Sequence, residues 1–258
     1  GTITYTQLLR EDLGIFRVTP DDGVPDFKAG QFLNLGLPLE SKIVNRAYSI
    51  ASSPENRDYF EFVIRWVRKP LPGRLTSLLF NAKEGDKISW TKPAGTLTIN
   101  DTLPNGEKDT RRIVCIGGGT GLAPFISFAQ HLHDTNDKRE IVILHGASYV
   151  DELSYKQLLT DLENESIAKG ADKWNFKYRA AISRPQEWTN RAWHGYKGRI
   201  EQFLRTSDNG KSPLEELVGE KITADNTMFY VCGWQGTIDG VMDYLKAKNF
   251  VTEKNKRE

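Results

Sequence analysis

The amino-acid sequence predicts two domains, an antiparallel β-barrel or sandwich over residues 1–103 and an α/β domain with a doubly wound parallel sheet over residues 104–258. The chain of 258 residues is long enough for two ordinary cores. Short alternating apolar segments fill the first part, whereas unbroken apolar strands alternate with helical segments in the second. The stretch between them, residues 100–112, is polar and has no periodicity.

The N-terminal part is expected to hold six or seven strands and one helix. Turn formers such as DDG, SSPEN and KEGD separate the apolar runs, as in an antiparallel sheet. Phe60, Phe62 and Ile64 fall on one face of a strand and Glu61 on the other, as a sheet with one buried face requires. The expected strands are residues 2–10, 15–20, 31–37, 47–52, 59–67, 87–90 and 95–99, and the expected helix is 73–82.

The C-terminal part reads as a series of βαβ units. Continuous apolar runs such as IVCI and IVIL suit parallel strands that are covered on both faces. The expected strands are residues 112–118, 140–147, 178–182 and 227–233, and the expected helices are 121–134, 151–164 and 236–248.

The composition of the chain argues against several classes of binding partner. The formal net charge is +1, so broad binding of nucleic acid or of a membrane surface has no electrostatic basis. No apolar run is long enough to span a bilayer and no signal peptide is recognisable, so we expect a cytoplasmic protein. Two cysteines outside any CxxC pair and four histidines without ligand spacing predict neither a disulfide framework nor a metal site.

A glycine-rich loop follows the first C-terminal strand. Gly117, Gly118, Gly119, Thr120 and Gly121 lie between a strand and a helix that carries Pro124 in its first turn. Glycines expose backbone N–H groups at a helix N-terminus and let a pyrophosphate approach closely. The spacing is neither that of GxGxxG nor that of a P-loop. The alternative is a connection that binds no ligand.

Ligands of open α/β sheets gather at the carboxyl ends of the strands. This geometry nominates His145-Gly146, Ser183-Arg184 and Cys232-Gly233, with Arg199 shortly after the second pair. Two guanidinium groups suit a phosphate, although surface arginines are usually only solvated. Cys232 has no acid–base partner in the pattern, so it is as readily a small core residue as a reactive one.

The ordered set of motifs AGQFLNLGL, NRAYSIASSPEN, GRLTSLL, KPAGTLTI, GGGTGLAP, LHGASYVDELSY, SRP, KGRI and VCG resembles the ferredoxin-NADP reductase family, especially its bacterial branch. The resemblance covers nearly the whole chain. It implies an N-terminal barrel that binds FAD and a C-terminal domain that binds NADP(H), with hydride transfer between nicotinamide C4 and flavin N5.

The resemblance assigns roles to residues of both parts. Arg46 contacts the FAD pyrophosphate, Tyr48 stacks on the isoalloxazine, and Ser49 lies near N5, where it and Cys232, beside the nicotinamide, are the catalytic candidates. Along a strand, Arg46 and Tyr48 share one face and Ser49 takes the other. The implied FAD residues are Arg46, Ala47, Tyr48, Ser49, Ile64, Leu75, Thr76, Ser77 and Thr120. The implied NADP residues are Gly119, Thr120, Gly121, Pro124, Ser148, Ser183, Arg184, Arg199, Cys232 and Gly233.

The sequence departs from the bacterial pattern at two places. Ser148 stands where several relatives carry an arginine that meets the 2′-phosphate of NADP, so Arg184 and Arg199 carry that preference alone. The chain ends in the charged segment NFVTEKNKRE rather than in an aromatic, with Phe250 as its last aromatic residue. Trp234 is also unusual, and either covers the adenosine or packs on the following helix.

The implied activity is that of an FAD-dependent oxidoreductase that passes electrons between NADP(H) and an acidic ferredoxin or flavodoxin. A basic rim of Arg65, Arg68, Lys69 and Arg74 is the expected docking surface, unless these side chains are only solvated. Three alternatives remain: an NADH-dependent reductase component of an oxygenase system, a diaphorase or flavin reductase, and a non-catalytic dinucleotide-binding redox sensor.

Overall fold

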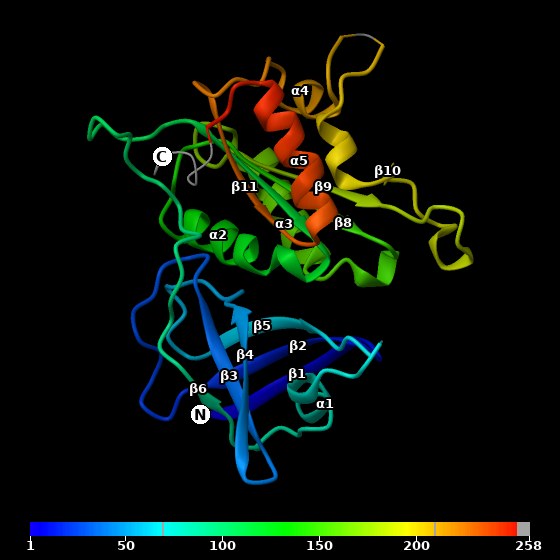
Figure 1. Cartoon of the computed structure of the whole chain (residues 1–258). Helices are drawn as coiled ribbons and strands as arrows, with labels where there is room; N and C mark the ends of the chain where they lie inside the picture. The colour runs from blue at the N-terminus through cyan, green and yellow to red at the C-terminus, as the bar shows by residue number, and fades with distance from the viewer. Residues whose placement is uncertain (69, 209, 252–258) are drawn as a thin grey trace. The chain divides into compact units, whose positions relative to one another are not determined.

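The computed structural model describes residues 1–68, 70–208 and 210–251 (Figure 1). The chain divides into two compact units. The first consists of Gly1–Asn100 and Ala123–Asp137, and the second of Asp101–Leu122 and the residues from Lys138 onward. The two units alternate along the chain, because helix α2 (Ala123–Asp134) groups with the N-terminal residues. The expected domain boundary after Leu103 stays a prediction.

The N-terminal unit contains two three-stranded antiparallel sheets, which confirms the predicted β architecture. One sheet has the order β1-β2-β5 and the other β4-β3-β6. Its elements are β1 (Thr2–Arg10), β2 (Leu13–Thr19), β3 (Phe32–Leu39), β4 (Lys42–Ser49), β5 (Phe60–Arg65), α1 (Arg74–Leu79), β6 (Ser89–Trp90) and α2.

The two sheets share one apolar core, and the expected alternation places residues in it. Phe60, Phe62 and Ile64 of β5 are buried together with Leu33 and Leu35 of β3. Opposite them on β2, Phe16 pairs in register with Phe62. The inward face of β5 is therefore the predicted one. The expectation of a single buried face was wrong, because Val63 is also buried and Glu61, on the same face, is 7% exposed and forms an ion pair with Arg17.

The strand expected at residues 95–99 does not form. Gly95 has a φ of +113°, and a Cβ placed on it would lie 2.9 Å from the Phe32 ring. Only an isolated bridge between Phe32 and Ala94 is present there. The prediction was wrong because this left-handed backbone conformation turns the chain out of the sheet. Strand β4, in turn, begins five residues before the expected position.

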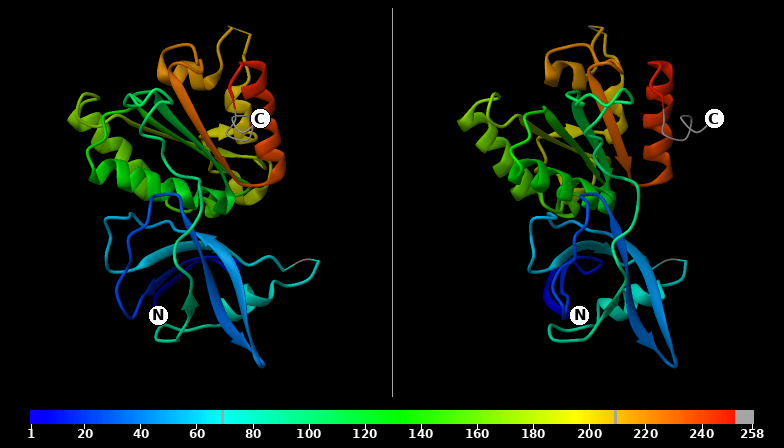
Figure 2. Two further views of the ribbon diagram at one scale, coloured as in Figure 1. Left: turned by 60° about the vertical axis from the view of Figure 1, so that its left-hand side comes forward. Right: turned by 90° about the vertical axis from the view of Figure 1, so that its left-hand side faces the viewer.

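The second unit holds a five-stranded parallel sheet with the order β10-β9-β8-β7-β11. Figure 2 shows α3 on one face of the sheet and α5 on the other, which confirms the doubly wound architecture. The strands are β7 (Arg112–Gly118), β8 (Ile141–Ala147), β9 (Phe176–Ile182), β10 (Tyr196–Lys197) and β11 (Thr227–Cys232). The helices are α3 (Lys156–Lys169), α4 (Pro213–Val218) and α5 (Gln235–Ala247), with 3₁₀ turns η1 (Gly119–Leu122), η2 (Val150–Glu152), η3 (Trp188–Asn190) and η4 (Ile200–Leu204).

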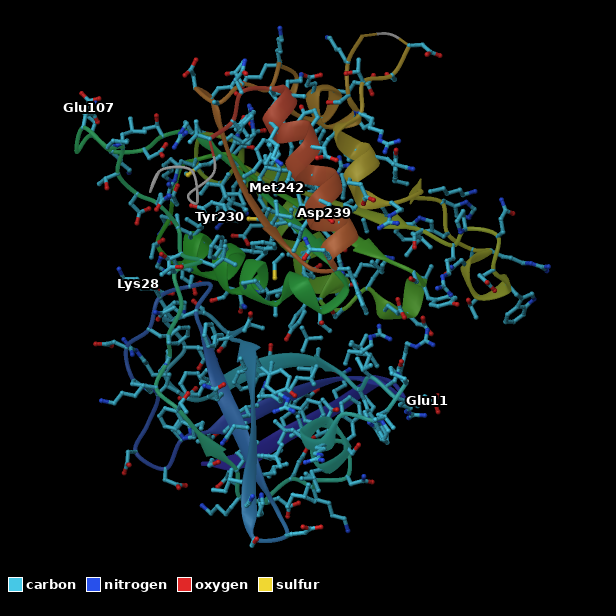
Figure 3. The ribbon with its side chains drawn as sticks, in the orientation of Figure 1. Glu11, Lys28, Glu107, Tyr230, Asp239 and Met242 are labelled. Atoms are coloured by element: carbon cyan, nitrogen blue, oxygen red, sulfur yellow. The ribbon has the colours of Figure 1, made fainter. Side chains whose placement is uncertain are left out.

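Helix α5 packs its apolar side on the sheet through Val241 and Leu245, which join the core of β7 and β8. Met242 also packs against this core, whereas Asp239 is exposed and accepts a hydrogen bond from Gln235 Nε2 at 2.7 Å (Figure 3). Helix α3 starts at Lys156 rather than at Asp151, because Tyr155 adopts a left-handed conformation with a φ of 57°.

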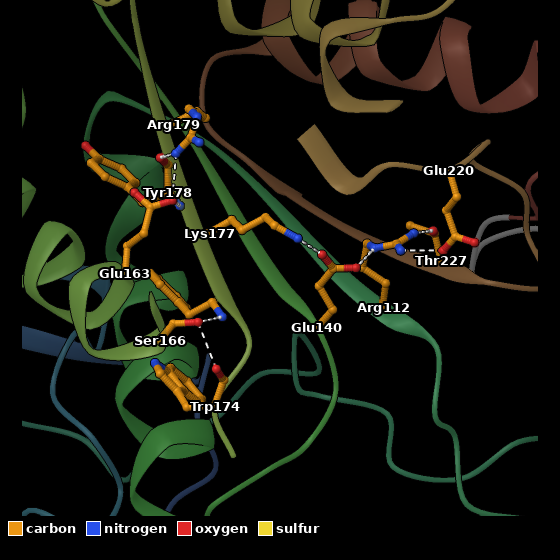
Figure 4. Close-up of polar contacts among 11 residues, drawn as sticks. Arg112, Glu140, Glu163, Ser166, Trp174, Lys177, Tyr178, Arg179, Glu220 and Thr227 are labelled. Atoms are coloured by element: carbon orange, nitrogen blue, oxygen red, sulfur yellow. Dashed lines mark hydrogen bonds and ion pairs between the residues drawn. The ribbon is translucent and has the colours of Figure 1, made fainter. Parts of the chain in front are cut away.

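A network of charged side chains around the buried Arg112 lies at the amino ends of the strands (Figure 4). Arg112 forms ion pairs with Glu140 and Glu220, and its Nη1 donates to Thr227 Oγ1 at 3.2 Å. Glu140 also pairs with Lys177 of β9. The side chain of Arg112 is 7% exposed, so these partners satisfy a charge that water does not reach. The network fixes the amino edge of the sheet.

Among the described helices, the longest, α3, has 14 residues, and none has the length and hydropathy of a membrane span.

Candidate functional site

The sheet order places a crossover point between β7 and β11. β7 comes first along the chain, β8, β9 and β10 follow on one side, and β11 lies on the other. Gly117 at the end of β7 pairs in register with Cys232 at the end of β11. In open α/β sheets, a ligand binds outside the carboxyl ends of the strands at such a point. The glycine loop and the Cys232-Gly233 corner both lie at this edge.

Packing explains three glycines at this point. A Cβ on Gly117 would lie 2.8 Å from Leu122 Cα, and a Cβ on Gly121 would lie 2.5 Å from the Cys232 carbonyl oxygen. Gly233 has a φ of +147°, and its Cβ would lie 2.9 Å from the Gly118 nitrogen. These glycines let the η1 loop and the β11 corner approach closely, whether or not a ligand is bound.

Gly119 is different, because packing does not require it. Its φ is +56°, and the nearest atom to a Cβ on it would be Trp234 Nε1 at 4.0 Å. The open space at this residue is what close approach of a phosphate to backbone amides needs. Thr120, next in the loop, is also partly exposed.

Trp234 borders the same space. Its side chain is among the exposed large apolar groups, at 74%, and it lies at the N-cap of α5. A side chain with this exposure buries little area against the following helix, and a contact of Trp234 with an adenosine stays a prediction. Among the described residues, nothing hydrogen bonds to its indole N–H.

Burial raises the pKa of the Cys232 thiol above its usual value, and the nearby Gly233 backbone opposes this only in part. The thiol is therefore protonated at neutral pH. A role for Cys232 as a nucleophile would require the opposite shift. Its placement beside the nicotinamide stays a prediction.

The loops after β8 and β9 come together at the same edge. The Ser183 amide donates to the Ala147 carbonyl at 2.9 Å. Arg184 Nη1 donates to the Tyr149 hydroxyl at 2.8 Å, and its Cζ lies 5.4 Å from the centre of the Tyr149 ring. Arg184 is exposed. The structure thus brings Ser148, Ser183 and Arg184 into one region, with the guanidinium oriented by Tyr149.

Two polar side chains that the sequence pattern did not single out shape these loops. Glu152 accepts hydrogen bonds from the amides of Ser148 and Tyr149 at 3.1 and 3.3 Å. Asn190 hydrogen bonds to the Ser148 and Arg184 carbonyl groups. No local signal could have identified them, because an asparagine in a polar loop and an acidic residue before a helix are both common.

Arg199 has a different partner from Arg184. Its Nε lies 2.6 Å from Glu201 Oε1, and its Nη2 would lie 3.1 Å from a Cβ on Gly236 in the first turn of α5. Arg199 is therefore directed toward the start of α5, whereas Arg184 is directed toward Tyr149.

His145 at the end of β8 is fully buried. Burial lowers its pKa to about 3, and the nearby backbone of Gly119 opposes this only in part. Its Nδ1 lies 3.3 Å from the Tyr178 hydroxyl. The imidazole is neutral at physiological pH.

In the N-terminal unit, β4 is the edge strand of its sheet and is mostly exposed. Tyr48 and Arg46 pair with Leu33 and Leu35 of β3, so both lie on the same side of the strand, as expected. Tyr48 is half-buried against the barrel core, and this burial raises its pKa to about 12. The phenol is therefore neutral.

Arg46 is exposed, and its Nη1 donates to the Asn45 carbonyl at 2.7 Å. Among the described residues it has no acidic partner. On the same strand, Ile43 is 57% exposed and Ala47 is also exposed. Because side chains alternate along a strand, Ile43 and Ala47 lie on the opposite face from Arg46 and Tyr48. The face of Arg46 and Tyr48 combines a guanidinium that has no acidic partner among the described residues with a half-buried phenol. It fits a ligand that has a planar ring and phosphates.

Other expected FAD residues are less accessible. Ile64 and Leu75 are each 1% exposed and lie in the barrel core, so only their backbone is available. The hydroxyl groups of Thr76 and Ser77 donate to the Gly73 carbonyl at 3.1 and 2.8 Å. Pro124 is buried in α2. A contact of these residues with a cofactor stays a prediction.

Two arginines of the expected basic rim are paired with acidic side chains. Arg65 Nη1 lies 3.0 Å from Asp12 Oδ2, and Arg68 Nη1 lies 3.3 Å from Oε1 of Glu11, a residue labelled in Figure 3. Arg74 is exposed, and Lys69 lies outside the described residues. Within the described part of the chain, no group of three or more His, Cys, Asp or Glu side chains could hold a metal ion.

Comparison with known proteins covers both units. Residues 2–99 match the family model of an oxidoreductase FAD-binding domain, and residues 115–243 that of an oxidoreductase NAD-binding domain. A ferredoxin–NADP reductase of Azotobacter vinelandii is 32% identical over 221 residues, which are 85% of this chain and 78% of that protein. The chain belongs to the ferredoxin–NADP reductase family.

Two relatives with different named activities have similar sequence identity to this chain. A flavodoxin/ferredoxin–NADP reductase of Escherichia coli is 28% identical over 90% of this chain and 84% of that protein. The reductase component of a propane 2-monooxygenase from Mycolicibacterium goodii is also 28% identical, over 92% of this chain but only 60% of that protein. The family therefore fixes the cofactor types more firmly than the electron acceptor.

A solved structure of a ferredoxin–NADP⁺ reductase from Neisseria gonorrhoeae, which contains FAD and NADP, shares the fold. The TM-score is 0.78 at 23% identity, covering 99% of this chain and 93% of that chain. As a member of the ferredoxin–NADP reductase family, the protein is an oxidoreductase with an FAD-binding and an NAD(P)-binding domain.

Proposed function

We propose that this reductase transfers electrons between NADP(H) and a one-electron carrier protein, a ferredoxin or a flavodoxin. The observation that carries the proposal is the exposed guanidinium of Arg184, oriented by the Tyr149 hydroxyl at the carboxyl edge of the sheet. A planar, permanently charged fork suits the 2′-phosphate that distinguishes NADP from NAD. Relatives named ferredoxin–NADP reductase support the same assignment.

The residues of β4 would hold FAD. Arg46 is available for the pyrophosphate because no acidic side chain of the described residues neutralises it. Tyr48 would present its neutral ring to the isoalloxazine, and Ser49 would offer its hydroxyl to N5 and help to hold a proton there. When bound, FAD supplies the redox chemistry, accepting a hydride from nicotinamide C4 at N5 and releasing electrons singly.

The glycine loop would hold the dinucleotide pyrophosphate. Gly119 leaves the loop open on one side, and the amides that precede α2, a helix of 12 residues, offer hydrogen-bond donors. Cys232 and Gly233 border the same crossover point. Because the Cys232 thiol stays protonated, it would act there as a small neutral neighbour of the nicotinamide.

A second candidate is an NADH-dependent reductase component of an oxygenase system. The likeness to the propane 2-monooxygenase reductase component favours it. Ser148 agrees with it, because the family resemblance implies an arginine at this position in several bacterial relatives. A diaphorase or flavin reductase would differ only in the acceptor. A non-catalytic sensor would bind both nucleotides without turnover.

The test is an anaerobic reduction of the FAD-loaded protein with NADPH and with NADH, followed by the flavin absorbance. We expect fast bleaching with NADPH and slow bleaching with NADH. Arg184→Ala is expected to remove this difference. Arg191→Ala, which changes another exposed arginine after the same strand, is the matched control and is expected to keep it. Faster bleaching with NADH in the unsubstituted protein contradicts the proposal and favours the oxygenase reductase.

The acceptor is tested separately with ferredoxin, flavodoxin, free FMN and an oxygenase iron–sulfur protein. The proposal expects the highest kcat/KM with ferredoxin or flavodoxin. A preference for free FMN identifies a flavin reductase, and bleaching without transfer to any acceptor identifies a sensor.

A further inference from the structure

Asn190 lies at the end of η3, between the loops that follow β8 and β9, and it is 1% exposed. Both polar atoms of its side-chain amide form hydrogen bonds to the backbone. Nδ2 donates to the Ser148 carbonyl at 2.9 Å and to the Arg184 carbonyl at 2.8 Å, and Oδ1 accepts from the Val150 amide at 2.9 Å. A neutral amide that joins three backbone groups fixes their relative positions.

These backbone groups directly flank the proposed 2′-phosphate site. Ser148 and Val150 enclose Tyr149, whose hydroxyl accepts the hydrogen bond from Arg184 Nη1. Arg184 is tied through its carbonyl to Asn190 and through its guanidinium to Tyr149. Backbone and side chain together close a ring of hydrogen bonds, so the position of the guanidinium depends on a residue that the nucleotide cannot reach.

We propose that Asn190 is a positioning residue that sets the preference of this protein for 2′-phosphorylated nucleotides, by holding the Tyr149 and Arg184 loops in register. The inference rests on the proposed NADP(H) function. Asn190 carries no charge and is buried, so it acts through Arg184 and not through direct contact with the phosphate. Displacing the loops weakens the phosphate contact, whereas the redox chemistry remains unaffected.

The experiment compares Asn190→Ala, Arg184→Ala and the double variant as FAD-loaded proteins. Titration calorimetry gives the dissociation constants of 2′,5′-ADP and 5′-AMP, which differ only in the 2′-phosphate. We expect Asn190→Ala to lower the preference for 2′,5′-ADP about tenfold, the effect of roughly one charge-assisted hydrogen bond. In the Arg184→Ala background, Asn190→Ala should cause no further loss.

Steady-state kinetics with ferricyanide as acceptor supply the second readout. Asn190→Ala is expected to raise the KM for NADPH with kcat unchanged, and to leave both constants for NADH unchanged. A loss of kcat with both nucleotides would indicate a general structural role and overturn the inference. Asn190→Ser, which keeps a smaller donor, is expected to fall between the unsubstituted protein and Asn190→Ala.

Asn226 is the matched control. It is also a loop asparagine of the second unit, and its side chain donates to the Lys221 carbonyl at 2.9 Å and accepts from the Thr223 amide at 3.0 Å. It lies at the amino end of β11, away from the proposed site. Asn226→Ala is expected to lower the free energy of unfolding and to leave the nucleotide preference unchanged.

The outcomes separate this inference from the proposed function. If the unsubstituted protein binds both nucleotides equally, or Arg184→Ala has no effect, the NADP(H) assignment fails. If that assignment holds, two results refute the role of Asn190. In the first, Asn190→Ala and Asn190→Ser keep the full preference for 2′,5′-ADP. In the second, Asn190→Ala lowers the preference by the same factor in the Arg184→Ala background as in the unsubstituted protein.

Discussion

The Nε atom of Arg199 lies 2.6 Å from Oε1 of Glu201, a carboxylate whose side chain is only 9% exposed. An arginine that the family resemblance assigns to the 2′-phosphate is thus already paired with a nearly buried negative charge. The second oxygen of Glu201 is buried without a hydrogen-bond partner among the described residues. Glu201 therefore holds Arg199 in place and at the same time reduces the positive potential that it offers to a phosphate.

Replacing Glu201 by glutamine removes this charge and keeps an oxygen that can accept from Arg199. We expect Glu201→Gln to tighten the binding of 2′,5′-ADP about two- to fivefold at low salt, and less at high salt, because the removed repulsion is screened. Binding of 5′-AMP should not change. Weaker binding of 2′,5′-ADP would mean that orientation of Arg199 matters more than its net charge.

Tyr48 should affect cofactor content more strongly than folding. Tyr48→Phe keeps the ring and its packing against the barrel core, so FAD binding and stability are expected to stay close to those of the unsubstituted protein. Tyr48→Ser removes the ring, and is expected to lose most of its FAD on dilution and about 1–3 kcal/mol of unfolding free energy. The measurements are the flavin-to-protein absorbance ratio and urea unfolding. Full FAD retention in Tyr48→Ser would assign the residue to packing alone.

His145 makes stability depend on pH. Its pKa of about 3 in the folded protein lies below the usual value near 6.5, so the unfolded chain binds more protons between these limits. The contribution is complete above about pH 6.5 and is lost as the pH falls through this window, with a slope approaching about 1.4 kcal/mol per pH unit. His145→Gln is expected to flatten the urea-unfolding profile between pH 6.5 and 4. Exchange of the exposed His194 for glutamine should leave that profile unchanged.

Glu140 should matter for stability and not for nucleotide selection. Glu140→Ala removes the ion-pair partner of Lys177 and one of the two acidic partners of the buried Arg112, so we expect a loss of roughly 3 kcal/mol in the free energy of unfolding. Glu165→Ala removes a more exposed helix pair with Lys169, and should cost less than about 1 kcal/mol. Equal losses in the two variants would show that burial does not govern the Glu140 network.

Local patterns were sufficient for much of the fold. The alternation of Phe60, Phe62 and Ile64 predicted a strand with these three side chains in the core, although its other face is buried as well. The continuous run from Ile113 to Ile116 predicted a strand buried on both faces. Both are signals with a short period, so a few neighbouring residues carry them. The prediction of a strand at residues 95–99 was wrong because an apolar pattern carries no information about the positive φ of Gly95.

The positions of Gly119 and Arg184 could also be nominated from the sequence, because strand ends and glycine loops have recognisable neighbours, whereas Arg46 was nominated by the resemblance of its motif to a known family. The side chains that surround these residues could not be predicted from the sequence. The partner of Arg184 is 35 residues away along the chain, and Asn190 reaches across 42 residues to the Ser148 carbonyl. Contacts between residues this far apart along the chain cannot be recognised from local composition.

By itself, the sequence determined the class of each half, the position of most strands along the chain and the location of the glycine-rich loop, because backbone propensity and burial act over short stretches of chain. Only the tertiary structure decided which arginine has a compensating carboxylate, which glycines packing requires, and that Asn190 ties the Ser148 and Arg184 loops together. These features depend on hydrogen bonds and ion pairs between distant segments, whose geometry exists only after the sheet has formed.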